Sequence, residues 1–450
     1  MSRLSPRAWI AKTLEAARSG FWALPGVVTL AAILASYATI AIDRAHGGAF
    51  RESILFAAGS EGARATLSAI ASSVMTVAGI SFSVTIVVLQ LASSQFSPRV
   101  MRGFLRDRLI QLVLGAYIGT FTYVLLVLRT VRSEGQGHEA FVPSLSITTA
   151  VILGLACMVL LIAFVHHVAQ SIQVSVIVDD IARESREAME KLYPEDIGEP
   201  AGQAAEAPPE GEGACREVLA LEDGYVEYLD ESAFAALEGA SLARIEVRVG
   251  DYVRKAEVVA RVWPGTAAEG AAEGGGAALA RAFELERERT MRQDLEFGFR
   301  MIVDVAVRAL SPGVNDPTTA VYCVNTLSAL LTDAARRKFP DCMRTLESGL
   351  VIHAPRSGFA DLARLSFKQI IHYGRGDFYV ANAVLAALEA INAQDTRGHH
   401  RAVLGQLAEH LLEVVATSPW PAQDRQDTVA RARRLLAGIA ARAARAPDDA

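Results

Sequence analysis

The clearest chemical pattern in this sequence is a row of hydroxyl and amide side chains along one apolar stretch, residues 65–98. An α-helix turns about 100° per residue, so the row falls on a single stripe roughly 80° wide. Ile86 is the main apolar residue within the stripe, and the far side of the same helix is aliphatic. The members of the stripe are Ser68, Ser72, Thr76, Gly79, Ser83, Gln90, Ser94 and Ser97.

Side chains of this kind can serve two purposes inside a membrane. They can let neighbouring helices approach closely and hydrogen-bond across the contact. They can also line a water-filled path, where hydroxyl and amide groups replace part of the hydration of an ion or solute. The stripe holds no charged residue, which disfavours a proton relay or a coupled pump. Both alternatives stay open, and the candidate pore-lining residues are Ser68, Ser72, Thr76, Ser83, Gln90 and Ser94.

Motifs for catalysis and for cofactor binding are missing from the sequence. It contains no GxSxG, no P-loop, no dinucleotide fingerprint and no HExxH. His353, His372, Asp304 and Asp316 lack the spacing of a metal site. The four cysteines are far apart and form no CxxC pair, so we interpret them as reduced packing residues. We therefore expect no enzyme, no cofactor and no metal.

The polar stripe belongs to the second of four long apolar segments. The chain has 450 residues, of which 51% are hydrophobic, and the excess lies in the first 170. About 20 apolar residues suffice for a helix to cross the hydrocarbon core. Because three more apolar runs follow the first, we expect a retained span rather than a signal peptide. The uncharged segments are Ser19–Ile42, Ala65–Pro98, Leu109–Leu128 and Ala140–Val165.

Lysine and arginine residues are distributed unevenly between the loops, which predicts the orientation of the spans. Four lie in the N-terminal tail and four in the second loop, and the tail after the fourth span opens with three more. The first and third loops hold fewer. We therefore expect the four spans to lie in the inner membrane. Both termini, and everything after about Val178, are expected on the cytoplasmic side.

The second loop reads as a short amphipathic helix on the inner leaflet. Ser97 and Pro98 form a plausible start, after which Arg99, Arg102 and Arg106 share one face. These arginines can bind anionic lipid headgroups or ring the inner mouth of a pore. Plain positive-inside anchoring is the simpler alternative.

Two smaller features accompany the later spans. Gly115 and Gly119 have the GxxxG spacing that permits close helix packing, for which an intramolecular contact is the favoured use. His166 and His167 close the fourth span at the cytoplasmic interface, either as a proton sensor or as ordinary interfacial residues.

The expected fold is an all-α four-helix transmembrane bundle, then a small β-rich, barrel-sandwich-like domain and an α-helical cytoplasmic domain. An amphipathic helix from about Ile177 to Leu192 is expected to extend the fourth span. Residues 281–445 are expected to be helical throughout. The predicted domains are 1–194 for the bundle, 195–213 and 265–280 for linkers, 214–264 for the β domain and 281–450 for the helices.

The stretch Val247–Val262 resembles a half-motif of the biotinyl and lipoyl carrier fold, with two strands around a turn at Gly250 and Asp251. Those carriers present a modifiable lysine on an exposed hairpin. Lys255 stands beside the Gly-Asp turn instead. We expect a structural or ligand-sensing domain without biotin or lipoyl attachment.

Two longer motifs carry a resemblance to a family that covers nearly the whole chain. They are the exit of the second span, VLQLASSQFSPR at 88–99, and the segment ALSPGVNDP at 309–317. With the four-span start, they resemble the bacterial membrane family catalogued as domain of unknown function 2254. The resemblance implies a bacterial multi-pass membrane protein and brings no established activity or site residues.

Two functional hypotheses follow. The first is an oligomeric channel for an ion or small solute, lined by the second span and regulated by the cytoplasmic half. The second is a membrane-anchored sensor or scaffold without transport. The expected partners are the lipid bilayer, including anionic lipids, and further copies of the chain. A net charge of −6 with interspersed signs makes nucleic acid an unlikely partner.

The orientation is testable by cysteine labelling in intact cells. With cysteine at position 103 or at position 137, in place of glycine, an impermeant reagent applied outside should label only position 137. The reason is that arginines hold the second loop on the cytoplasmic side. Labelling of position 103 alone would contradict the predicted orientation.

Overall fold

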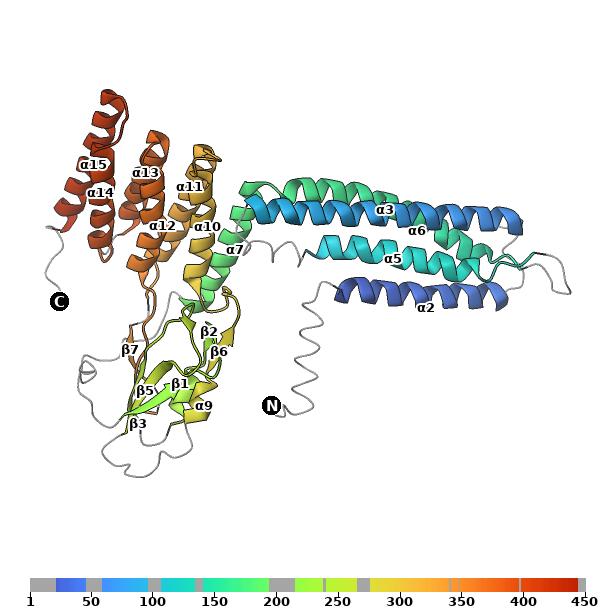
Figure 1. Ribbon diagram of the computed structural model, residues 1–450, viewed down its shortest axis with the longest axis horizontal. Helices are drawn as coiled ribbons and strands as arrows, with labels where there is room; N and C mark the ends of the chain where they lie inside the picture. Colours follow the sequence, from blue (N-terminus) through green and yellow to red (C-terminus); the bar gives the residue numbers. More distant parts are fainter. Residues whose placement is uncertain are drawn as a thin grey trace. The chain divides into compact units, whose positions relative to one another are not determined.

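A computed structural model of the chain consists of two compact units, residues 1–176 and 177–450. The two units are described separately below, and Figure 1 labels their elements. The structure describes residues 22–45, 59–95, 107–133, 141–193, 215–237, 240–264, 276–339, 341–346, 348–395 and 398–443.

In the described part of the first unit, four helices lie side by side (Figure 1). They are α2 (Ala23–Ala45), α3 (Ser60–Gln95), α5 (Arg108–Leu128) and α6 (Ser144–Ser171). Each is long and apolar enough to cross a membrane, so the expected four apolar helices are confirmed. At about 1.5 Å per residue, the 36 residues of α3 extend about 54 Å, well beyond a hydrocarbon core of about 30 Å.

Helix α5 packs against the other three helices of this unit. It approaches α2 closely at Gly115, where an added Cβ would lie 2.9 Å from the Cα of Pro25. At Gly119 an added Cβ would lie 3.3 Å from the Cβ of Ala32. The two glycines of the GxxxG spacing therefore face α2 within the same chain. Farther along α5, the hydroxyl of Tyr123 lies 2.8 Å from that of Thr39 on α2.

A buried carboxylate connects the end of α2 to the start of α6. Asp43 is 7% exposed and accepts hydrogen bonds from the backbone N–H groups of Leu145 (3.0 Å) and Ser146 (2.9 Å). The hydroxyl of Ser146 donates a third bond, 2.7 Å long. The first N–H groups of a helix have no partner within it, so Asp43 caps α6 from another helix.

Helix α7 (Val174–Leu192) is separate from α6, which corrects the expected continuous extension of the fourth span. The reason lies in two local bonds at the end of α6. The hydroxyl of Ser171 donates to the carbonyl of Val168, and the N–H of Gln173 donates to the carbonyl of Gln170. From Ile177 onward, α7 buries one apolar face within the second unit.

The second unit contains two sheets. One has the strand order β1-β5-β3-β8-β7 and the other the order β4-β2-β6. Among the strand pairings in the described part of the chain, only that of β3 with β8 is parallel. The strands are β1 (Arg216–Leu219), β2 (Gly224–Leu229), β3 (Ala240–Ile245), β4 (Tyr252–Val253), β5 (Val258–Pro264), β6 (Phe283–Glu286), β7 (Met343–Thr345) and β8 (Val351–His353), with short helices α8 (Ser232–Ala235) and α9 (Gly276–Ala280).

Three of these strands lie in the stretch expected to be helical throughout, and that expectation was wrong. Strand β6 pairs with β2, and the β7–β8 hairpin adds to the edge of β3. These strands have only three or four residues, too few to show a period of two. Their partners are distant in sequence, so no local pattern predicts them. Ile352 of β8 is fully buried in the core shared by both sheets.

The remaining helices form successive antiparallel hairpins, visible in Figure 1 as a stack from α10 to α15. Asp316 caps α11 by accepting from the N–H of Thr319 (3.1 Å), and Pro317 occupies its first position. Asn315 just before it has φ +50°, a value that L residues rarely adopt. The helices are α10 (Leu295–Ala309), α11 (Pro317–Ala335), α12 (Phe359–Tyr373), α13 (Phe378–Gln394), α14 (Arg401–Ala416) and α15 (Ala422–Ala443).

The contact of α5 with α2 can be tested with a single methyl group. Gly115→Ala should lower stability by about 1–3 kcal/mol, because the added Cβ meets the backbone at Pro25. Gly26→Ala in α2 is the control, since an added Cβ there meets nothing within 4 Å. The measurement is thermal unfolding of the full chain in detergent. Equal midpoints for the two variants would contradict the close packing.

Candidate functional site

Helix α3 has two distinct faces. Its buried side chains pack into the bundle, whereas the described side chains of the polar stripe are exposed: Ser68, Ser72, Thr76, Gly79, Ser83 and Gln90. The side chain of Ser94, and Ser97 as a whole, lie outside the described residues. The buried face consists of Ala63, Leu67, Ala71, Val74, Ser81, Thr85 and Val88.

The stripe therefore lies about half a turn away from the packing face, and the bundle of a single chain does not cover it. One of its hydroxyls is satisfied locally, because Thr76 donates to the carbonyl of Ser72 (2.9 Å). A hydroxyl and amide face of this length is poorly suited to hydrocarbon. It is suited to a second copy of the chain or to water.

The exposed surfaces of α2 and α6 have a different composition. Val27 and Leu34 of α2 are 64% and 62% exposed, and Ile162 of α6 is 72% exposed. Large aliphatic side chains of this kind match the acyl chains of a bilayer. The polar face of α3 is thus distinct from its neighbours on the outside of the bundle.

The predicted arginine cluster Arg99, Arg102 and Arg106 lies outside the described residues. The residue that follows it, Asp107, caps α5 by accepting from the N–H of Leu109 (2.8 Å) and pairs with Nε2 of His167 (2.5 Å). His167 therefore connects the end of α6 to the start of α5.

The second unit holds a small cavity of about 50 Å³ at a convergence of five segments. Tyr193, just beyond α7, lies beside residues that follow β2, β3 and β8 and beside the start of α10. The lining residues are Leu192, Tyr193, Leu229, Glu231, Val247, Arg248, Val249, Gln293, Asp294, Leu295, Glu296, Ala354, Pro355, Arg356 and Ser357.

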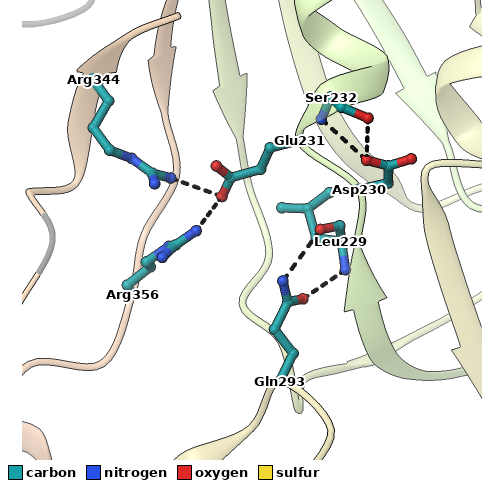
Figure 2. A network of polar contacts seen from close by, with 7 residues as sticks. All are labelled: Leu229, Asp230, Glu231, Ser232, Gln293, Arg344 and Arg356. Carbon is teal, nitrogen blue, oxygen red and sulfur yellow. Dashed lines mark hydrogen bonds and ion pairs between the residues drawn. The ribbon is translucent and has the colours of Figure 1, made fainter. Parts of the chain in front are cut away.

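Two arginines share one oxygen of Glu231, a carboxylate that lines this cavity, as Figure 2 shows. Oε1 of Glu231 accepts from Nη2 of Arg344 (2.7 Å) and from Nη2 of Arg356 (2.5 Å). All three side chains are roughly a fifth to a quarter exposed. Arg344 lies on β7 and Arg356 follows β8, so the carboxylate holds the hairpin against the segment after β2.

A glutamine side chain extends the same network. Oε1 of Gln293 accepts from the backbone N–H of Leu229 (2.8 Å), and Nε2 of Gln293 donates to the carbonyl of Leu229 (3.3 Å) (Figure 2). Gln293 thereby pairs with the end of β2 as a neighbouring strand would.

A buried ion pair supports the start of α10. Asp294 accepts from the N–H of Phe297 (3.1 Å) and lies 2.7 Å from Nη2 of Arg289. Burial raises the pKa of the Asp294 carboxyl, and Arg289 opposes that rise. Gly250, at φ +94°, approaches the pair so closely that an added Cβ would collide with both side chains.

Tyr193 connects the end of α7 to this cavity. Its ring centroid lies 4.8 Å from that of Phe339, and its carbonyl accepts from Nη1 of Arg337 (2.9 Å). Its hydroxyl donates to the carbonyl of Ser357 (3.5 Å). Burial raises the pKa of Tyr193 to about 12, so the hydroxyl stays protonated at neutral pH.

Sequence reasoning did not find this cavity, since Glu231 precedes Arg344 by 113 residues and Arg356 by 125. Among the described residues no three His, Cys, Asp or Glu side chains gather as metal ligands would. Lys255 lies in the exposed turn between β4 and β5. The role of Asp107 had a signal, because an Asp just before an apolar helix is a common cap.

Comparison with known proteins supports the membrane character of the chain. The family model described as "Predicted membrane protein (DUF2254)" matches residues 18–390. The uncharacterized proteins Mb1321c of Mycobacterium bovis and Rv1290c of Mycobacterium tuberculosis are each 34% identical to the chain over 434 residues. That alignment covers 96% of this chain and 81% of each relative. No solved structure matches the chain.

The ion pair between Asp294 and Arg289 leads to a prediction about the stability of the second unit. Asp294→Ala removes a cap and leaves Arg289 without its buried partner, so we expect a loss of about 2–3 kcal/mol. Asp377→Ala is the matched control, because Asp377 caps α13 (2.8 Å to the N–H of Tyr379) and should cost about 1 kcal/mol. Chemical denaturation of the full chain should rank the two variants in this order, and the reverse order would contradict the role of the pair.

Proposed function

Because this chain belongs to the family of predicted membrane proteins DUF2254, we propose that it forms a multi-pass protein of the bacterial inner membrane whose copies assemble around α3. The assembly encloses a path for an ion or small solute. Both termini and the second unit lie in the cytoplasm, where the second unit regulates the path. No catalysis is part of this proposal.

The single observation that carries the proposal is the exposure of the polar stripe on α3. Ser72, Thr76 and Ser83 point away from the packing face of their own bundle. Four spans are too few to enclose a hydrated path, whereas a ring of copies places one stripe from each around a shared axis. Hydroxyl and amide groups then replace water around the passing solute.

The surroundings of α3 fit the same assembly. The aliphatic exteriors of α2 and α6 supply the lipid-facing surface. Arg99, Arg102 and Arg106 are assigned to the inner leaflet, where they bind anionic lipids or surround the mouth of the path. Plain electrostatic anchoring of the second loop gives the same orientation.

Regulation follows from the connectivity of the chain. Helix α7 starts three residues after the end of α6, and Tyr193 just beyond its other end lines the charged cavity. Tyr322 of α11 donates to Asp179 of α7 (2.6 Å), and Arg186 pairs with Asp333 (3.1 Å). A change in the second unit therefore acts on a helix that is continuous in sequence with a span.

A second candidate is a membrane-anchored sensor or scaffold without transport. It is favoured by the cavity around Glu231 and Arg356, because a ligand could bind there whether or not the chain forms a pore. In that case the stripe of α3 serves only as the contact between copies.

The two candidates separate on flux through reconstituted liposomes. Thr76→Leu with Ser83→Leu places two apolar groups on the stripe about two turns apart, where a narrow wet path dewets. We expect solute flux to fall about tenfold or more while the oligomeric state persists. Ser73→Leu with Val84→Leu is the control, since both positions are exposed on α3 outside the stripe.

The control pair should leave flux close to that of the parent. If the parent shows no flux and the stripe variant loses its oligomeric state, the stripe is a packing face. The sensor or scaffold candidate would then replace the channel.

A further inference from the structure

The charges around the cavity of the second unit are unevenly compensated. Asp294 is paired with Arg289, and the carboxylate of Glu296 accepts from the hydroxyl of Ser357. Arg248, which lines the cavity, is exposed, and its guanidinium has no carboxylate partner within the described part of the chain. The cavity therefore presents an available cation at its rim.

At the wall of the cavity, the carboxylate of Glu231 accepts from two guanidinium groups, of which Arg356 lines the cavity and Arg344 does not. Arg344 and Arg356 both donate to the same oxygen of Glu231. The Nε of Arg344 is buried and has no hydrogen-bond partner among the described residues. An arginine fork can bind two oxygens of one anion, so this pair is only partly satisfied by Glu231.

The dimensions fit a small oxyanion. About 10–15 Å³ of such space holds one water molecule, so a cavity of about 50 Å³ holds a few waters or one phosphate-sized group. Ser357 and Gln293 also line the space, but their side chains already donate to Glu296 and to the carbonyl of Leu229. A phosphoryl group offers enough oxygens for the two arginines that line the cavity, Arg248 and Arg356, at once.

We propose that this cavity binds a phosphoryl group, with Arg356 and Arg248 as its ligands and Glu231 as a built-in carboxylate that competes with the ligand for Arg356. When the phosphoryl group binds, the bond between Glu231 and Arg356 is exchanged for one to the ligand. Ser357, next in sequence, accepts from the hydroxyl of Tyr193 through its carbonyl, so the exchange reaches the end of α7. This site goes beyond the proposed path through the membrane and does not depend on it.

Inorganic phosphate is the probe for the test, added to the purified full chain at constant ionic strength set by chloride. Thermal stabilisation should saturate with phosphate. Glu231→Gln keeps the shape and removes the competing charge, so the apparent affinity should rise about tenfold. Arg356→Gln should lower the affinity about tenfold or more.

A control pair of similar exposure lies elsewhere in the unit, where Arg431 bonds Glu389 (2.6 Å). Glu389→Gln should leave the phosphate affinity unchanged. The proposal is overturned if phosphate stabilises neither the parent nor the Glu231→Gln variant. It is also overturned if Glu389→Gln raises the phosphate affinity as much as Glu231→Gln does.

Nanodiscs distinguish a soluble ligand from a lipid headgroup. If the native phosphoryl group belongs to a lipid, nanodiscs with phosphatidate should lower the apparent affinity for inorganic phosphate relative to phosphatidylcholine. If the group is carried by a soluble molecule, the two affinities should agree. Either outcome is consistent with the site and shows whether its phosphoryl group comes from a lipid or from a soluble molecule.

Discussion

A helix in hydrocarbon must satisfy its backbone hydrogen bonds within itself, and its first N–H groups are the part that it cannot satisfy. The first unit solves this at two helix starts with carboxylates. Asp43 reaches from the end of α2 to cap α6, and Asp107 caps α5 while pairing with His167 on α6. Each of these carboxylates also joins two helices. The need to satisfy the first backbone N–H groups of α5 and α6 therefore sets which helix ends meet.

With the helix ends joined in this way, the bundle buries only one face of α3. Helix α5 takes the central place because Gly115 and Gly119 allow α2 to approach it. The buried face of α3 is then directed inward, and the hydroxyl face is left outside. Hydroxyl and amide groups on the outside of an apolar bundle need hydrogen-bond partners, and the acyl chains of lipid cannot supply them. The proposed assembly of copies follows from that constraint.

The second unit depends on pairing across long distances in the chain. The β7–β8 hairpin leaves the helical stack to complete the sheet at β3, and β6 completes the other sheet at β2. This interlocking brings Arg344 and Arg356 to Glu231. The same convergence places Tyr193 at the cavity. A charged site, a sheet and helix α7 are thus parts of one folded unit.

The sequence by itself determined the four apolar helices and the polar stripe, because hydropathy and helix period are local properties. Only the tertiary structure decided that the stripe is exposed, since the outer face of a helix depends on which neighbours it packs against. Tertiary structure also decided the short strands β6, β7 and β8 and the cluster at Glu231. Strand β6 meets β2 across more than 50 positions, and β8 meets β3 and the arginines meet Glu231 across more than 100, so no local signal encodes these contacts.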